Sequence, residues 1–347
     1  GGCSASCDGS TPSDGTKFSC FHSSFIPTVS PGCYVQSALF LNFDLMKFTN
    51  IKVLKGIGLM LLGMSIVPFL DIFAKLLSED YPVTQVTWTR FFFHAIWLLP
   101  MIIWQKVKLF SVPEKPSLQF LRGLMLTLAT LFFFAAIVTN DIPEALTLLF
   151  VSPLVVAVLS PFILGERFDI FIGVGVLIGF IGVIVVLQPD SEQFDPTLLF
   201  ALIAGFCYAL YIIITKKLSF RAPPVLTLFY SAIVGIVIMS LIVVPYWTTP
   251  DLKGVLMGAA MGFFAAASHF MIIKAFEFAS ASELSPFNYF EIVVAIILSY
   301  LVFGVLPNVQ AILGLIIIIL SGLYVSWRAM KNNQDQESKQ KAIIEPL

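Results

Sequence analysis

Hydrophobic residues fall into ten long runs, which are separated by short breaks that carry charges, prolines and glycines. Each run holds about 20 residues, which as an α-helix is enough to cross the roughly 30 Å hydrocarbon core of a bilayer. The runs are continuous, as in IFIGVGVLIGFIGVIVVL, whereas strands of a membrane barrel would alternate between apolar and polar residues. The pattern therefore predicts an all-α integral membrane protein with ten transmembrane helices, at approximately residues 56–77, 84–104, 118–138, 142–163, 169–188, 197–217, 224–246, 254–277, 282–304 and 307–327.

The composition and the net charge are consistent with a membrane protein, and they argue against a soluble globular protein or a nucleic-acid-binding protein. Hydrophobic residues make up 58% of the 347 residues and charged residues 12%, which is too few charges to cover a soluble globule. The formal net charge is −1, so the chain lacks the basic field that attracts nucleic acid. We therefore expect the lipid bilayer to surround this chain and expect no nucleic-acid partner.

The basic residues predict an orientation in the membrane. If the N-terminus is cytoplasmic, 16 of the 20 Lys and Arg residues, Arg122 among them, collect on the cytoplasmic side. The opposite side holds Lys253 and is otherwise acidic, as at Glu79 and Asp80. We therefore predict a multi-pass protein of the cell membrane whose N- and C-termini are both cytoplasmic.

The two ends of the chain differ from its apolar body. Residues 1–45 hold four of the five cysteines and are rich in Ser, Gly, Thr and Pro without a helical period. The cysteine spacings fit no common zinc site. We expect this segment to be a disordered or spurious extension that precedes a true start at Met46, and residues 328–347 to be a polar cytoplasmic tail.

The body repeats itself weakly at a period near 140 residues. EALTLLFVSPLVVAVLSPFILGERF at 144–168 aligns with ELSPFNYFEIVVAIILSYLVFGVLP at 283–307, and AKLLSEDYP at 74–82 aligns with TKKLSFRAP at 215–223. Identity this thin can arise by chance between apolar runs, but the agreement of both blocks with the span count favours a duplication.

Two repeats of five spans each follow from this duplication, over residues 46–190 and 191–327. Because five is odd, the second repeat crosses the membrane in the opposite sense to the first. Inverted repeats around a site near the bilayer midplane are a recurring architecture of secondary transporters.

The ten-span layout resembles the EamA-type branch of the drug/metabolite transporter superfamily over residues 56–327. The string SPLVVAVLSPFILGERF resembles that branch's proline-containing helix that closes in Gly-Glu, and FLDIFAKLLSEDYPVTQVTWTRFFF is also similar to its members. The second repeat reads FGVLP at the matching place, so Val305 replaces the family's second Glu. The resemblance implies alternating-access transport of small metabolites without ATP.

Charged residues within the first two spans are candidate site residues, because a charge at the bilayer centre costs at least about 2.5 kcal/mol. Asp71 and Arg90 both lie a little outside the midplane, and we expect them to meet across the first hairpin. His94 follows Arg90 by four residues and shares its helix face. The pair can be a structural ion pair, or Arg90 can bind a substrate carboxylate or phosphate.

Glu291 is the strongest candidate in the second repeat. It lies within about one helical turn of the midplane, and Asn288 precedes it by three residues on the same face. Pro286 breaks the backbone hydrogen bonds there and frees carbonyl groups. We expect Glu291 to contact a substrate amine or to carry a proton, and a structural hydrogen bond to a neighbouring helix is the alternative.

Several aromatic residues and a second histidine complete the candidate set. Trp88, Tyr208 and Tyr211 can line a cavity and stack on a flat or cationic substrate. His269 lies deeper than Lys274 and on another face, where it is either a site residue or a core histidine. The predicted substrate-binding or coupling residues are thus Asp71, Trp88, Arg90, His94, Tyr208, Tyr211, His269, Asn288 and Glu291.

Other residues are predicted to shape the scaffold. Glycine runs in spans five and eight, such as Gly175 and Gly262, allow helices to approach closely. Pro153 and Pro161 should kink span four, and Lys274 should pair with Glu277 on one helix face.

These features favour a secondary transporter that moves an amino acid, an amine or a similar zwitterion, driven by a proton or a counter-substrate. We predict no cofactor, metal site or catalytic residue. A membrane-embedded lipid-modifying enzyme would need a cluster of His, Asp or Cys, yet His94 and His269 are the only histidines of the body. A non-transporting membrane scaffold is the third alternative, and a homodimer is left open.

Overall fold

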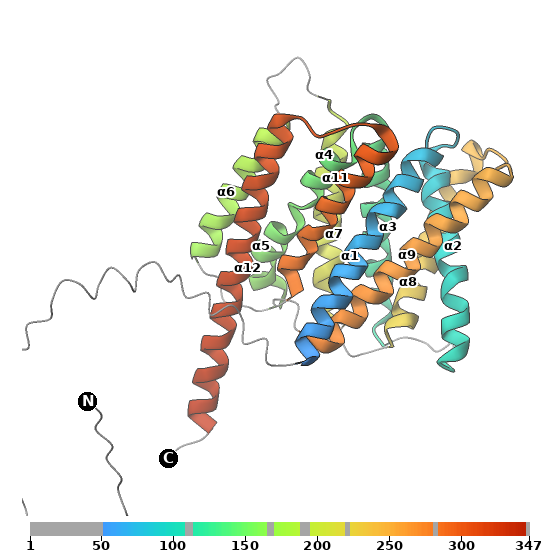
Figure 1. Ribbon diagram of the computed structural model, residues 1–347. Coiled ribbons are helices and arrows are strands. Elements are labelled where there is room, and N and C mark those ends of the chain that lie inside the picture. The colour runs from blue at the N-terminus through green and yellow to red at the C-terminus, as the bar shows by residue number, and fades with distance from the viewer. Residues whose placement is uncertain are drawn as a thin grey trace, which may run out of the picture. The chain divides into compact units, whose positions relative to one another are not determined.

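The computed structural model describes residues 51–107, 114–164, 170–187, 195–218, 223–279 and 284–344, and the regular elements of these residues are all helices (Figure 1). The segment predicted as an N-terminal extension lies outside them. The α-helices are α1 (Ile51–Leu77), α2 (Val83–Trp104), α3 (Pro116–Thr139), α4 (Ile142–Leu149), α5 (Ser152–Leu164), α6 (Ile170–Leu187), α7 (Leu198–Lys217), α8 (Pro224–Val243), α9 (Leu252–Phe278), α11 (Phe290–Phe303) and α12 (Val309–Ile344). Two short 3₁₀ helices, η1 (Val244–Tyr246) and η2 (Ser285–Tyr289), precede α9 and α11.

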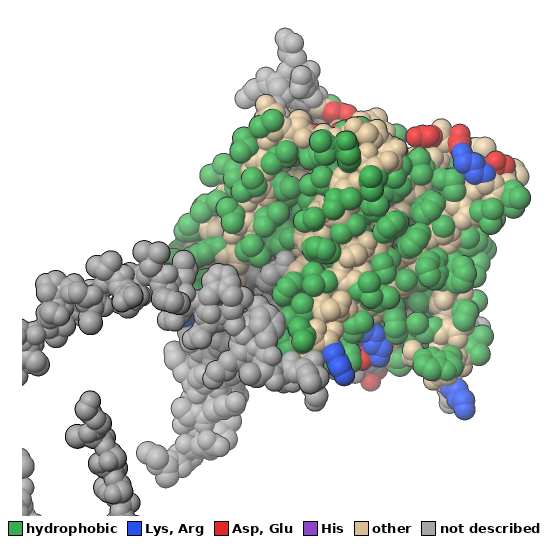
Figure 2. Space-filling model, viewed as in Figure 1, with side chains coloured by type: hydrophobic (Ala, Val, Ile, Leu, Met, Phe, Trp, Pro, Cys, Tyr) green, Lys and Arg blue, Asp and Glu red, His purple; other side chains and the backbone are tan. Residues whose placement is uncertain are grey.

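The predicted membrane helices are confirmed. Within the described ranges, eight helical segments are long and apolar enough to cross a bilayer, and two shorter apolar segments lie at 287–303 and 309–325. The last helix continues past the predicted end of its span to Ile344. Figure 2 shows why the bundle suits lipid: apolar side chains cover its flank, while charged side chains gather at its two ends.

The fourth predicted span is one segment interrupted by a break. Helix α4 ends at Leu149 and α5 begins at Ser152, so Phe150 and Val151 lie between them. Pro153 lacks the N–H that would bond the carbonyl of Leu149, and this explains the predicted kink. Pro161 lies inside α5.

A break occurs at the equivalent place in the second repeat. At the offset of 139 residues read from the sequence, Phe150 corresponds to Tyr289, where η2 ends and α11 begins. The two rings contact each other, with centroids 5.2 Å apart. Two equivalent residues that touch must lie close to the axis that relates the repeats, so the breaks mark the centre of the duplicated fold.

The helices of each repeat pack mainly on helices of the other repeat. Helix α1 packs mainly on α9 and its counterpart α7 on α3, while α2 packs on α8 and α6 lies beside α12 (Figure 1). Glycines permit the closest approaches, as predicted: a Cβ on Gly182 would lie 3.0 Å from the carbonyl oxygen of Gly314. The Ser321 hydroxyl donates to the Gly175 carbonyl at 2.6 Å across the same pair of helices. Neither repeat therefore buries its apolar surface without the other.

Gly262 allows a testable close approach of α9 to α2. A Cβ at this position would lie 2.7 Å from the carbonyl carbon of Phe93, which is backbone and cannot yield. We expect Gly262→Ala to lower the free energy of unfolding by about 1–3 kcal/mol through overpacking. Thermal unfolding in detergent measures this.

Gly58 provides the matched control, because no neighbouring element of the described structure comes within 4 Å of a Cβ built on it. Gly58→Ala should leave stability unchanged or raise it by up to about 1 kcal/mol through helix propensity. Equal effects of the two substitutions would contradict the close packing of α2 on α9.

Candidate functional site

A central cavity of about 100 Å³ lies where the two helix breaks meet the long helices. Its wall combines apolar and aromatic side chains with a small set of polar ones. Its lining comprises Met64, Val67, Leu70, Asp71, Arg90, Leu126, Ala129, Thr130, Phe133, Phe134, Leu149, Phe150, Ser152, Pro153, Tyr208, Ile212, His269, Ile272, Asn288 and Glu291. A mostly apolar pocket with few convergent polar groups is the usual form of a small-molecule site.

The cavity gathers most of the predicted site residues. Six of the nine line it: Asp71, Arg90, Tyr208, His269, Asn288 and Glu291. They come from five different parts of the chain, so the fold brings together groups that are up to 220 positions apart. Thr130 and Ser152 add hydroxyl groups that the sequence alone did not single out.

Arg90 binds His269 and not the expected Asp71. Its Nη2 lies 3.0 Å from His269 Nε2, and a guanidinium can only donate, so His269 accepts at Nε2 and carries its proton on Nδ1. The ring of His94 stacks on that of His269 with centroids 5.9 Å apart. His94 therefore supports the cavity wall from behind.

The expectation that Asp71 and Arg90 meet directly is wrong, although both side chains line one cavity. They form no ion pair within 4 Å, and Asp71 Oδ2 and the Nε and Nη1 of Arg90 lack a hydrogen-bond partner among the described residues. Both residues are 3% exposed. Buried charged groups are costly without partners, so these atoms are available to a ligand.

The break between η2 and α11 places Glu291 and Asn288 at the cavity. Glu291 lies in the first turn of α11 and is 8% exposed. Asn288 lies in η2, and its Oδ1 has no hydrogen-bond partner in the described part of the chain. The corresponding positions in the first repeat are Ser152 and Leu149, which also line the cavity. The two repeats thus offer the same backbone positions with different chemistry.

Arg122 is an important residue that is absent from the predicted site. It is one of the basic residues that predict the cytoplasmic side, and its side chain is fully buried in the bundle. Its Nε donates to Thr215 Oγ1 at 2.7 Å and its Nη1 to the Thr227 carbonyl at 3.0 Å. Further bonds run from Nη1 to Ser231 Oγ at 2.5 Å and from Nη2 to the Tyr211 hydroxyl at 2.9 Å. Arg122 therefore joins α3 of the first repeat to α7 and α8 of the second.

Tyr211 lies behind the cavity wall and not in it. Arg122 holds its hydroxyl and also lies over its ring, 4.7 Å from the centroid. Tyr211 in turn stacks on Tyr208, whose ring lines the cavity, at 5.6 Å. Arg122 thus fixes the cavity wall through two stacked rings.

Trp88 lies away from the central cavity. Its Nε1 donates to Ser240 Oγ at 2.8 Å, and its ring lines a second pocket near one end of the bundle. The predicted pair of Lys274 and Glu277 is confirmed as an exposed ion pair at 2.8 Å.

Comparison with known proteins identifies the class. The EamA-like transporter family matches residues 54–188 and again residues 195–327, which together are most of the chain. The chain belongs to the EamA-like transporter family. It is therefore a duplicated, multi-pass membrane transporter and not a lipid-modifying enzyme.

Individual relatives are named as transporters of S-adenosylmethionine or of riboflavin. An S-adenosylmethionine uptake transporter of Rickettsia conorii is 29% identical over 287 residues, which cover 82% of this chain and 97% of the relative. One from Rickettsia felis is 30% identical over 278 residues, covering 80% and 94%. A riboflavin transporter of Vibrio cholerae is 30% identical over 197 residues, covering 56% of this chain and 65% of the relative.

A solved crystal structure shares the fold. It superposes with a TM-score of 0.57 and 16% identity, and the match covers 79% of this chain and 98% of that chain.

Arg122 gives a prediction on stability. Arg122→Ala should lower the free energy of unfolding by more than about 3 kcal/mol, because hydrogen bonds to a charged group contribute about 1.5–3 kcal/mol each. Arg122→Lys should recover little, because one ammonium cannot reach four partners spread over two helices. Thermal unfolding in detergent checks both variants.

Lys217→Ala is the control, since Lys217 is an exposed cation at the end of α7 and its removal should leave the unfolding temperature unchanged. A stable Arg122→Ala protein would show that the four hydrogen bonds contribute little.

Proposed function

We propose that this protein takes up a cationic, amphoteric adenosyl metabolite of the S-adenosylmethionine type by alternating access through the central cavity. The observation that carries the proposal is the charge of that cavity. Asp71 and Glu291 supply two carboxylates and Arg90 one guanidinium, a formal charge of −1. S-adenosylmethionine has the complementary set, since it carries a sulfonium, an ammonium and one carboxylate.

Each part of such a ligand has a suitable group in the cavity. The free Oδ2 of Asp71 and the carboxylate of Glu291 suit the two cationic centres, and the unpartnered N–H groups of Arg90 suit the carboxylate. Aromatic rings of the lining, such as Tyr208 and Phe150, suit the faces of a planar base or a sulfonium. The relatives from Rickettsia support the same ligand class.

Alternating access is supported by the size of the cavity and by contacts that join the two repeats toward the two ends of the bundle. A volume of about 100 Å³ is below the about 300–1,000 Å³ of typical ligand sites, so the cavity must widen to admit a metabolite. At one end, Gln85 bonds the backbone of Thr248 in both directions, at 2.6 and 2.8 Å. At the other end, Arg122 joins α3 to α7 and α8. Both sets of bonds link one repeat to the other, so rocking of the repeats can break them in turn.

The distribution of basic residues supports cytoplasmic termini in the cell membrane. In that orientation the end with Gln85 and Thr248 faces outward, and the Arg122 end faces the cytoplasm.

Neutralising either carboxylate tests the proposed substrate class. Asp71→Asn and Glu291→Gln should each lower uptake of labelled S-adenosylmethionine into proteoliposomes at least tenfold, or about 1.4 kcal/mol. The matched control is Glu277→Gln, which changes an exposed carboxylate of the ion pair with Lys274. Full uptake by both cavity variants, or equal inhibition by riboflavin, which is neutral, would sink the proposal.

Glu291 is also the proposed proton carrier. If a proton drives uptake, an inward proton gradient should accelerate the native protein, and Glu291→Gln should lose this response because an amide cannot titrate. Uptake with and without an imposed gradient measures it. A response that survives in Glu291→Gln would assign coupling to another group or to a counter-substrate.

A further inference from the structure

A second pocket lies near the end of the bundle where α2 and α9 begin, and we name it the Trp247 pocket. Its volume is about 290 Å³, larger than that of the central cavity. It is lined by Leu77, Tyr81, Gln85, Val86, Trp88, Thr89, Phe92, Phe93, Trp247, Pro250, Gly254 and Val255. Both repeats contribute to this wall.

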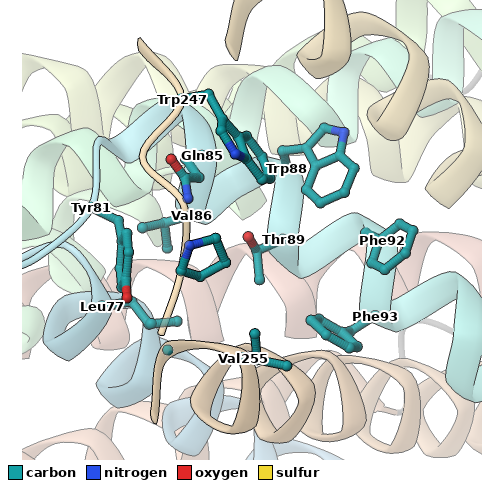
Figure 3. Close-up of a pocket in the computed structure, with 12 residues that line it drawn as sticks. Leu77, Tyr81, Gln85, Val86, Trp88, Thr89, Phe92, Phe93, Trp247 and Val255 are labelled. Carbon is teal, nitrogen blue, oxygen red and sulfur yellow. The ribbon is translucent and has the colours of Figure 1, made fainter. Parts of the chain in front are cut away.

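Aromatic rings form much of the pocket wall. Tyr81, Trp88, Phe93 and Trp247 lie on different sides of it (Figure 3). Trp88 stacks on Phe92 with centroids 4.7 Å apart and stands edge-on to Trp247 at 5.4 Å. The indole N–H of Trp88 donates to Ser240 Oγ. Trp88 can therefore contact a ligand in the pocket with its ring, while its N–H is already used.

Gln85 and Tyr81, two polar residues of the pocket, are engaged within the protein. Gln85 uses both ends of its amide on Thr248, and the Tyr81 hydroxyl donates to Asp251 Oδ1 at 3.0 Å. These bonds hold the segment that carries Trp247 against the first repeat. With the polar groups of Gln85, Tyr81 and Trp88 occupied, the pocket offers a ligand mainly stacking and apolar contact.

The rim of the pocket is acidic. Glu79, Asp80 and Asp251 are exposed beside it and outnumber Lys253. Hydrogen bonds from the Gly254 N–H and the Tyr81 hydroxyl hold the pKa of Asp251 below its usual value, so this carboxylate stays charged at neutral pH. Charged side chains gather at this end of the bundle (Figure 2), which places the mouth at the aqueous boundary. An acidic rim favours cations over neutral compounds.

Helix α2 contributes side chains to both this pocket and the central cavity. Thr89 and Phe93 on α2 line the Trp247 pocket, and Arg90, which follows Thr89 directly, lines the cavity. A molecule bound in the pocket is therefore next to the central site but not in it.

We propose that the Trp247 pocket is a second substrate site, which binds the planar heteroaromatic ring of a cationic metabolite before that metabolite enters the central cavity. This rests on the proposed function for the identity of the metabolite. Aromatic rings on several sides suit a flat base, and base–aromatic stacking is worth about 1–3 kcal/mol per base. The acidic rim selects the cationic form.

Trp247→Ala tests this second site by two measurements. Quenching of tryptophan fluorescence by S-adenosylmethionine and by adenosine, in lipid nanodiscs, should fall at least threefold. The KM for uptake should rise at least fivefold while the maximal rate stays within twofold, because the central site is intact. Trp104→Ala is the matched control, since Trp104 is 81% exposed at the far end of α2 and should leave KM unchanged.

The double variant Asp71→Asn with Glu291→Gln separates the two sites. It should lose uptake yet keep the quenching, because the Trp247 pocket is unaltered. Lack of uptake by the native protein, with quenching by adenosine intact, would overturn the proposed function alone. Unchanged quenching and KM in Trp247→Ala would overturn the second site. Quenching relieved by oleate but insensitive to adenosine would also overturn it and identify an acyl-chain pocket.

Discussion

The cost of placing charge inside an apolar bundle governs this structure. Two buried guanidinium groups meet that cost in different ways. Arg122 donates to four neutral partners on α7 and α8, and so becomes part of the scaffold. Arg90 uses one nitrogen on His269 and leaves two without partners among the described residues, in a cavity that Asp71 also lines. A buried guanidinium whose nitrogens all have hydrogen-bond partners is a structural group. One with unpartnered nitrogens marks the place where a ligand is expected.

The duplicated architecture supplies a symmetric frame, and unequal side chains make it selective. Leu149 in the first repeat corresponds to Asn288 in the second, Ser152 corresponds to Glu291, and all four line the cavity. Asp71 corresponds at an offset of 141 residues to Ile212, which also lines it. Each repeat thus contributes acidic chemistry where the other contributes an apolar or neutral group. The two repeats can therefore rock in a nearly symmetric motion although they contact the substrate with different side chains.

Much of the fold and part of the site followed from the sequence. The spans, the duplication, the break before Pro153 and the position of Glu291 near a broken helix depend on local composition and spacing. Which face of a helix meets the cavity did not follow, because lipid and protein interior are equally apolar and leave little periodic signal. Trp88 therefore lines a different pocket from the predicted one, and the burial of Arg122 did not follow from the sequence, because its partners, three hydroxyls and one carbonyl, lie about 90 to 110 positions away.

The exchange of partners between repeats has a consequence for biosynthesis. Helix α1 ends at Leu77, whereas its main partner α9 begins at Leu252. At roughly 5–20 residues per second, ribosomes need about 9 to 35 seconds to make the intervening chain. During this interval Asp71 and Arg90 lie near the translocon or among lipids, because α9, which later covers them, has not yet been synthesised. A nascent chain that stalls before α9 would therefore expose these charges and become a natural target for membrane quality control.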